Sequence, residues 1–231
     1  MLKKISYMTA GESHGKGLIG IIEGIPAGMN ITEEYIEKDL LRRMQGHGRG
    51  GRMKIEKDHA EIFSGVRHAV TLGSPISLLI KNFDWVNWED RMATGKPKKE
   101  HRKVSMPRPG HADLAGVMKY GLDDIRNVLE RSSARETAMR VAIGAVCRKL
   151  LEEVGITVGS RVYQIHNIVD NTPVSNDMGL KELNDTVDAS PVRCFDKDAE
   201  KKMMDVIDEA RNNGDSVGGS FEVIAKGLPY G

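Results

Sequence analysis

Cysteine and aromatic residues are scarce in this chain. Two cysteines, Cys147 and Cys194, among 231 residues are too few for the disulfide framework of a small secreted protein, which suits a reducing compartment. Four Phe, five Tyr and two Trp disfavour a surface that stacks on many nucleic-acid bases. The sequence has neither a signal peptide's apolar core nor a run of about 20 apolar residues that would span a membrane. We therefore expect a soluble, cytoplasmic protein with no membrane partner.

Length and composition allow one large domain or two small ones, because 39% apolar residues support a core and 29% charged residues are ordinary. The net charge of +1 conceals two basic runs, residues 42–57 and 96–108, each with six Lys or Arg against one Glu. A basic run is most simply a solvated face. Both runs also contain histidine, which a solvated face does not require, and this combination favours an anion site.

Strands and helices alternate irregularly along the sequence. Strands are predicted at residues 18–23, 61–67, 75–81, 156–165 and 220–226, and helices after Thr32 and at residues 112–129, 136–154 and 197–213. Residues 83–110 are irregular and basic, as in long functional or disordered loops. Because some strands follow one another directly, the pattern favours an α+β fold over a doubly wound parallel sheet.

Two histidines, His14 and His111, differ from His59, His68, His101 and His166 because glycine and polar residues surround them. His14 lies in Gly-Glu-Ser-His-Gly at residues 11–15, and His111 in Arg-Pro-Gly-His-Ala-Asp at residues 108–113. A histidine titrates near neutral pH, so it can give a proton to a leaving group or a cofactor ring. Arginine and backbone N–H groups hold phosphate in fixed geometry. These runs predict an enzyme that acts on phosphorylated molecules.

A glycine cluster at residues 46–51 matches the dinucleotide fingerprint G-x-G-x-x-G by letter. A helix is predicted before it and an extended segment after it, the reverse of the Rossmann context. The glycines still allow a ligand to approach the backbone closely, and Arg43, Arg49 and Arg52 flank the turn. The simpler alternative is a flexible basic hairpin.

The run at residues 131–136 precedes the longest predicted helix. It contains Arg131, Ser132, Ser133 and Arg135. Hydroxyl and N–H groups at a helix N-terminus bind phosphate readily. Helix capping alone would also explain the two serines. A metal site is not expected, because the histidines lack H-E-x-x-H spacing and the cysteines lie far apart.

These motifs resemble the signatures of the chorismate synthase family. The similar segments are Gly-Glu-Ser-His-Gly leading to Ile-Glu-Gly-Ile-Pro at residues 22–26, residues 48–53, 108–113 and 214–219, and Arg-Ser-Ser-Ala-Arg-Glu-Thr-Ala-Met-Arg at residues 131–140. The resemblance covers essentially the whole chain. It implies one domain over residues 1–231 in which antiparallel sheets sandwich helices.

The resemblance also implies an activity. The family converts 5-enolpyruvylshikimate 3-phosphate to chorismate and phosphate by a 1,4-elimination that requires reduced FMN. This lyase reaction belongs to the shikimate pathway of aromatic amino-acid biosynthesis. Some members reduce the flavin with NADPH and others use an outside reductant, and the sequence leaves this open. Full-length members are commonly homotetramers.

The family's roles carry over residue by residue. By this analogy His14 protonates the departing phosphate, and His111 protonates or stabilises the reduced flavin. Substrate or NADP phosphate would be bound by Arg43, Arg49, Arg52 and Arg108. The FMN phosphate or ring edge would be bound by Arg131, Ser132, Ser133 and Arg135.

One departure from the family concerns length. Family members are well over a hundred residues longer, and a third signature, of the form Arg-His-Asp, has no counterpart here. We therefore expect a C-terminally truncated chain with little or no activity alone. A basic nucleic-acid-binding module around residues 49–51 is the alternative function, although near-zero net charge and few aromatics favour no nucleic-acid partner.

Overall fold

The structure is a computed structural model that describes residues 4–50 and 57–230. The chain divides into two compact units, the first made of Met1–Leu40 and Arg52–Val146 and the second of Leu41–Gly51 and Cys147–Gly231. Each unit combines helices with an antiparallel sheet, which confirms the predicted α+β class. The single domain over residues 1–231 stays a prediction.

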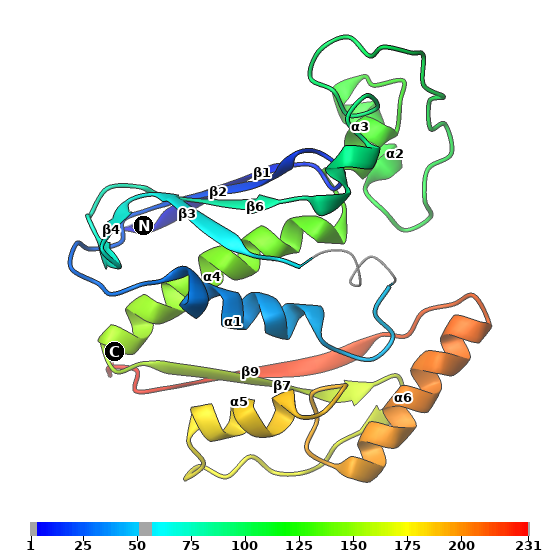
Figure 1. The fold of residues 1–231 in the computed structure, drawn as a ribbon. Helices are drawn as coiled ribbons and strands as arrows, with labels where there is room; N and C mark the ends of the chain where they lie inside the picture. The colour runs from blue at the N-terminus through cyan, green and yellow to red at the C-terminus, as the bar shows by residue number, and fades with distance from the viewer. Residues whose placement is uncertain (1–3, 51–56, 231) are drawn as a thin grey trace. The chain divides into compact units, whose positions relative to one another are not determined.

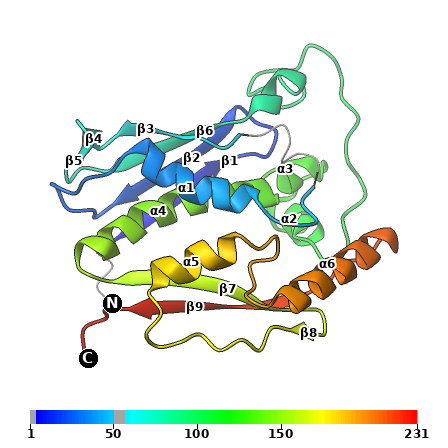
Figure 2. The same cartoon turned by 60° about the horizontal axis from the view of Figure 1, so that its bottom comes forward.

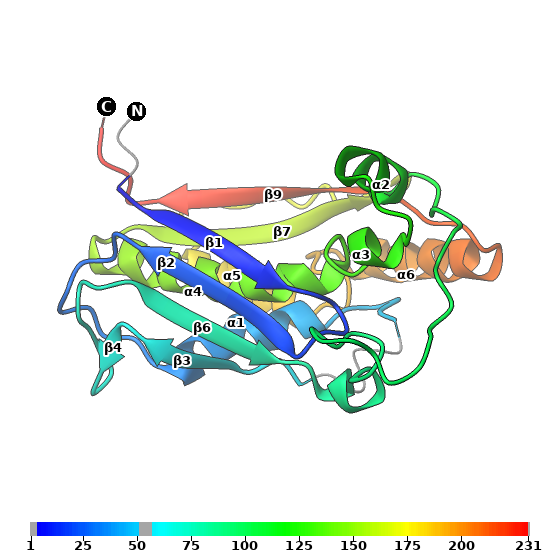
Figure 3. The ribbon, with the colours of Figure 1, turned by 90° about the horizontal axis from the view of Figure 1, so that it is seen from above.

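The sheet of the first unit has four strands in the order β1-β2-β6-β3 (Figure 3). They are β1 (Ser6–Gly11), β2 (Gly17–Glu23), β6 (Ile76–Lys81) and β3 (Ala60–Ser64). Every neighbouring pair is antiparallel. Burial alternates along β2 and β6, so one face of this sheet belongs to the core.

Helix α4 (Thr137–Glu153) packs its N-terminal half on that inner face (Figure 1). Gly20 of β2 permits the contact, because a Cβ there would lie 2.5 Å from Met139 Sδ and 2.9 Å from Ile143 Cδ1. Both side chains are buried. The lack of a side chain at position 20 thus allows the helix to approach the sheet closely.

Helix α1 (Glu33–Met44) begins where the sequence predicts, because the Thr32 hydroxyl accepts the Tyr35 N–H at 3.3 Å. The helix expected at residues 112–129 is instead two helices, α2 (Asp113–Tyr120) and α3 (Arg126–Leu129). Gly121 ends α2 in the left-handed region, at φ 64°. This correction matters because the turn after α3 leads directly to the site.

Three further details differ from the sequence-based expectations. The sequence does not predict strand β1, since its residues show little apolar alternation. Gly65, at φ 82°, separates β3 from the short hairpin of β4 (Val66–Arg67) and β5 (Val70–Thr71), so residues 61–67 are not one strand. A 3₁₀ helix, η2 (Phe83–Asn87), opens the region expected to be irregular.

The second unit has a three-stranded sheet with β7 in the centre. Strand β7 (Thr157–Ile165) pairs with β8 (Ile168–Val169) and with β9 (Gly219–Lys226). Helix α5 (Leu180–Asp188), which the sequence does not predict, lies along β7 (Figure 2). The predicted helix near residues 197–213 is α6 (Lys197–Asn212).

Helix α5 contacts β7 at Gly159, where a Cβ would lie 3.2–3.3 Å from the side chains of Leu180 and Leu183. Helix α6 begins at Asp196, whose carboxylate accepts the N–H groups of Asp198 and Ala199. Among the residues that the structure describes, no helix combines the length and apolar character needed to cross a bilayer.

Candidate functional site

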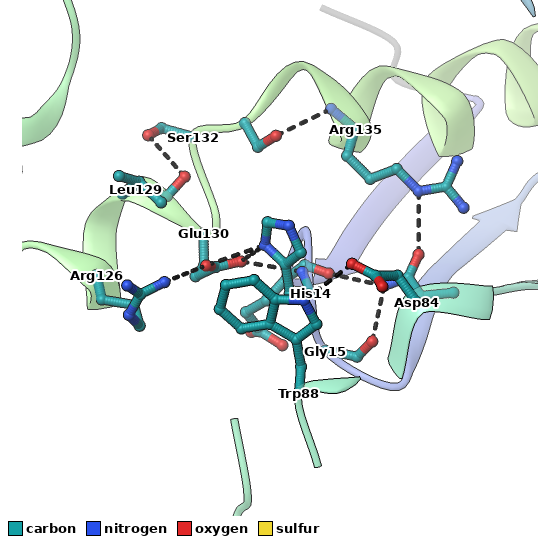
Figure 4. Close-up of polar contacts among 12 residues, drawn as sticks. His14, Gly15, Asp84, Trp88, Arg126, Leu129, Glu130, Ser132 and Arg135 are labelled. Carbon is teal, nitrogen blue, oxygen red and sulfur yellow. Dashed lines mark hydrogen bonds and ion pairs between the residues drawn. The ribbon is translucent and has the colours of Figure 1, made fainter. Parts of the chain in front are cut away.

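The carboxylate of Glu130 lies against His14 at the end of α3 (Figure 4). His14 Nδ1 lies 2.8 Å from Glu130 Oε2 and 3.1 Å from Oε1, and the His14 backbone N–H donates to Oε2 at 2.9 Å. Arg126 Nη1 donates to Oε1 at 3.1 Å. Burial raises the pKa of the Glu130 carboxyl, but the hydrogen bonds from His14 and the Arg126 charge outweigh it, so that pKa lies below its usual value. Glu130 is therefore an ionised carboxylate.

Trp88 stacks on the face of the His14 ring (Figure 4). The ring centroids are 4.0 Å apart and the planes differ by 28°. The indole is itself held, because its Nε1–H donates to Asp84 Oδ2 at 2.8 Å. The guanidinium carbons of Arg91 and Arg126 each lie 5.3 Å from the Trp88 ring centroid.

Buried polar contacts fix the backbone of the loop that carries His14. The Ser13 N–H donates to the Glu130 carbonyl at 2.9 Å. The amide of Asn82 donates to the carbonyls of Glu12 and Gly15, at 3.0 and 2.8 Å. Asn82 is only 4% exposed, so these bonds lie in the protein interior. The loop between β1 and β2 is thus anchored on both sides of His14.

His111 belongs to a second polar cluster in the same unit. Arg108 donates two hydrogen bonds of 2.8 Å to the buried carboxylate of Asp113 and a third, of 3.0 Å, to His111 Nδ1. Hydrogen bonds from Arg108 outweigh burial and hold the pKa of Asp113 well below its usual range. Because Nδ1 accepts from Arg108, a neutral His111 carries its proton on Nε2.

An electrostatic interaction links the two histidine clusters. The hydrogen bond to Asp113 is the main cause that raises the pKa of Arg108, and the charge of Glu130 adds to it. The charge of Glu130 therefore favours the cationic form of Arg108, while its carboxylate contacts His14.

The run at residues 131–136 follows α3 and leads into α4. Arg131 donates to the carbonyl and hydroxyl oxygens of Thr9, at 3.0 and 2.8 Å. Ser133 caps the short 3₁₀ helix η3 (Ala134–Glu136) by accepting the Arg135 N–H at 3.3 Å. Ser133 is therefore a capping residue. The Ser132 hydroxyl instead lies 3.5 Å from the Leu129 carbonyl.

The side chain of Arg135 points into the interior of the first unit. It is 4% exposed, donates Nε–H to Asn82 Oδ1 at 3.0 Å, and forms an ion pair with the buried carboxylate of Asp58. The hydrogen bond from Arg135 holds the Asn82 side chain, whose amide nitrogen in turn donates to the His14 loop. Its predicted role as a flavin ligand stays a prediction.

The remaining predicted phosphate ligands lie elsewhere in the chain. Arg43 is in the last turn of α1, and Arg49 lines a cavity of about 360 Å³ in the second unit together with Arg42 and Arg193. Arg52 falls outside the described residues. Because both histidines belong to the first unit, a single site that joins them to these arginines stays a prediction.

Sequence reasoning missed the residues that hold His14 in place. Glu130 is 116 residues away from it, and Trp88 and Asn82 come from the region expected to be irregular or at its edge. The one usable signal was a glutamate directly before the Arg131 run. Among the described residues, no group of three or more His, Cys, Asp or Glu side chains is arranged to hold a metal ion.

The chain resembles known proteins over almost its whole length. A family model described as chorismate synthase matches residues 5–231. Curated chorismate synthases from Listeria welshimeri and Bacillus subtilis are 53% and 54% identical to it, each over 97% of this chain. A crystal structure of chorismate synthase is 40% identical, with a TM-score of 0.77 over 99% of this chain and 60% of that one.

These matches establish the class of protein. The family model, the curated relatives and the solved structure all carry the description chorismate synthase. The chain belongs to the chorismate synthase family. It spans 58% of the length of the two curated relatives.

Proposed function

We propose that this chain forms the part of a chorismate synthase that carries two proton-handling histidines. The full reaction is the 1,4-elimination of phosphate from 5-enolpyruvylshikimate 3-phosphate, which yields chorismate for aromatic amino-acid biosynthesis. One observation carries the proposal: the family-signature His14 has its Nδ1 against a buried, ionised carboxylate. Family membership supports the class of reaction, a carbon–oxygen lyase.

In this proposal His14 acts on the departing phosphate. The carbon–oxygen bond breaks, and its electron pair leaves with the phosphate, which needs a proton and nearby positive charge. The imidazolium of His14 gives its Nε2 proton to the phosphate oxygen, while Nδ1 keeps its hydrogen and donates it in a hydrogen bond to Glu130. Charge neutralisation is assigned to the arginines named from the sequence, Arg43, Arg49, Arg52 and Arg108.

The residues before α4 fit an FMN phosphate or ring edge. Arg131 is 39% exposed at its side chain, and Ser132 and Ser133 are half-buried at the start of a long helix whose N-terminus favours anions. Arg135 supports this segment from the interior through Asp58. When bound, reduced FMN supplies an electron transiently and takes up the ring hydrogen.

His111 is proposed to serve the flavin. Its Nδ1 accepts from Arg108, so its Nε2–H is the donor offered to an anionic ring nitrogen. The flavin could be reduced by NADPH or by an outside reductant, and the proposal leaves this open. The same proposal includes a homotetrameric assembly of the full-length enzyme.

The test is anaerobic phosphate release with reduced FMN. The 231-residue chain is compared with a hybrid in which it is followed by the sequence beyond the matched region of the Bacillus subtilis relative. We expect turnover from the hybrid and none from the chain alone. In the hybrid, His14→Ala and His111→Ala each lower kcat about 100-fold or more. A hybrid that binds both ligands but releases no phosphate contradicts the proposal.

The nucleic-acid-binding alternative gains no support from the family matches. A salt titration separates the two functions. Nucleic-acid binding would fall steeply and linearly on a log–log plot against salt, whereas FMN binding would depend on the redox state of the flavin.

A further inference from the structure

Glu130 presents an acceptor-only group to three donors. The carboxylate accepts hydrogen bonds from the His14 backbone N–H and from Arg126, and it also contacts Nδ1 of the His14 ring. An ionised carboxylate has no hydrogen to donate, so the hydrogen in the Nδ1 contact belongs to the imidazole. The neutral ring therefore carries its proton on Nδ1, and Nε2 is the nitrogen that exchanges a proton with a ligand.

Two contacts in different directions fix the orientation of this ring. Glu130 holds one edge, and Trp88 covers one face at a centroid distance of 4.0 Å. Asp84 and Arg126 hold Trp88 and Glu130 in turn, at 2.8 and 3.1 Å. The ring thus has little freedom to rotate, although its side chain keeps 22% exposure for a ligand.

We propose that Glu130 is a positioning residue that fixes the tautomer and orientation of His14 and pairs with its positive charge until Nε2 gives up its proton. This inference rests on the proposed function only for the identity of the proton's acceptor, the phosphate oxygen. Charged groups also contact the two residues that hold this ring: Arg126 pairs with Glu130, Asp84 accepts the Trp88 indole N–H, and Arg91 lies over the Trp88 ring.

The first test does not depend on activity. In the ¹⁵N-labelled 231-residue chain, the His14 imidazole is assigned by the signals lost in His14→Gln. We expect the neutral ring to be protonated on Nδ1 and unprotonated on Nε2. In Glu130→Gln the midpoint pH of the His14 titration falls by about one unit or more, because the cationic ring loses its paired charge. Glu130→Asp, which keeps the charge, retains most of the midpoint.

The wild-type spectrum alone can overturn the inference, even if Glu130→Gln does not fold. A neutral His14 protonated on Nε2 contradicts it, and so does a midpoint in Glu130→Gln equal to that of the wild type. Glu152→Gln is the matched control, because Glu152 also pairs with an arginine one helical turn earlier but lies outside the site. We expect the Glu152→Gln variant to leave the His14 titration unchanged.

The second test uses the hybrid enzyme. If His14 donates its proton as a cation, activity falls at high pH as the ring loses its charge, and Glu130→Gln moves this alkaline limb to lower pH. We expect kcat to fall at least about tenfold at neutral pH with little change in KM. A Glu130→Gln enzyme that loses stability but keeps the wild-type pH profile contradicts the inference. An inactive hybrid with the expected NMR result contradicts the proposed function and leaves the positioning role standing.

Discussion

Arg135 and Asn82 form a buried pair beneath the His14 loop. The guanidinium Nε–H of Arg135 donates to Asn82 Oδ1 at 3.0 Å, and the amide nitrogen of Asn82 donates to two loop carbonyls. An arginine from the signature-like run at residues 131–140 therefore supports the backbone of the Gly-Glu-Ser-His-Gly run at residues 11–15. The link passes through a side chain that neither run contains.

We expect Asn82→Ala to lower the free energy of unfolding by about 3 kcal/mol, because it leaves several buried polar groups without partners. Asn87→Ala is the matched control, since Asn87 is exposed and its amide donates to the nearby side chain of Asp84. It should change stability by less than about 0.5 kcal/mol. Urea unfolding of the chain measures both, and equal effects would disprove the interior role of Asn82.

Gly20, which faces helix α4, and Gly144, which lies on the exposed side of that helix, are expected to respond to alanine in opposite directions. Gly20→Ala places a Cβ within 2.5 Å of Met139 Sδ and should destabilise the protein by about 1–3 kcal/mol through overpacking. Gly144→Ala, on exposed α4 surface with nothing within 4 Å, should stabilise it by about 0.5–1 kcal/mol. Thermal and urea unfolding give the signs. A stabilised Gly20→Ala protein would show that the sheet and helix are not in close contact.

The depressed pKa of Asp113 predicts a pH dependence of stability. A carboxyl whose pKa is lower in the folded than in the unfolded protein stabilises the fold above the unfolded pKa. This contribution is lost as the pH falls below about 4, the ordinary Asp value, toward the folded value. The stability difference between wild type and Asp113→Asn should therefore shrink in acid. Urea unfolding from pH 7 to pH 3 tests this, and a constant difference would exclude the linkage.

The two serines before α4 should separate capping from ligand binding. Ser133→Ala removes the acceptor for the Arg135 N–H and should cost about 1 kcal/mol of folding stability. Ser132→Ala should change stability by less than about 0.5 kcal/mol but weaken FMN binding about tenfold, the loss of one hydrogen bond to a charged group. Unfolding curves and equilibrium dialysis of FMN measure the two effects. Unchanged FMN binding in Ser132→Ala would remove that serine from the flavin site.

The sequence predicts the elements whose burial follows a regular period. Strands β2 and β6 alternate apolar and exposed positions, and α4 repeats apolar residues at helical spacing. Strand β1 escapes prediction because its six residues are mostly exposed at the sheet edge. Helix α5 escapes because nine residues with three buried apolar side chains give too short a pattern.

In the candidate site, the sequence identifies some of the residues but not their partners. His14 and His111 are recognisable because glycine and polar neighbours mark their loops. Glu130 is not recognisable as the partner of His14, since folding brings the two together across 116 residues. Arg135 has the sequence context of a ligand, yet its guanidinium is directed to Asp58 in the interior. Local sequence reveals residue type and spacing, whereas the direction of a side chain depends on packing.

The stacking of Trp88 on His14 gives the protein an internal optical reporter. The chain has two tryptophans, Trp85 and Trp88, and the second lies in van der Waals contact with the imidazole. A cationic ring in contact with an indole quenches its emission more strongly than a neutral one. We therefore expect the Trp88 contribution to the intrinsic fluorescence to respond to the charge of His14, without labels, substrate or flavin.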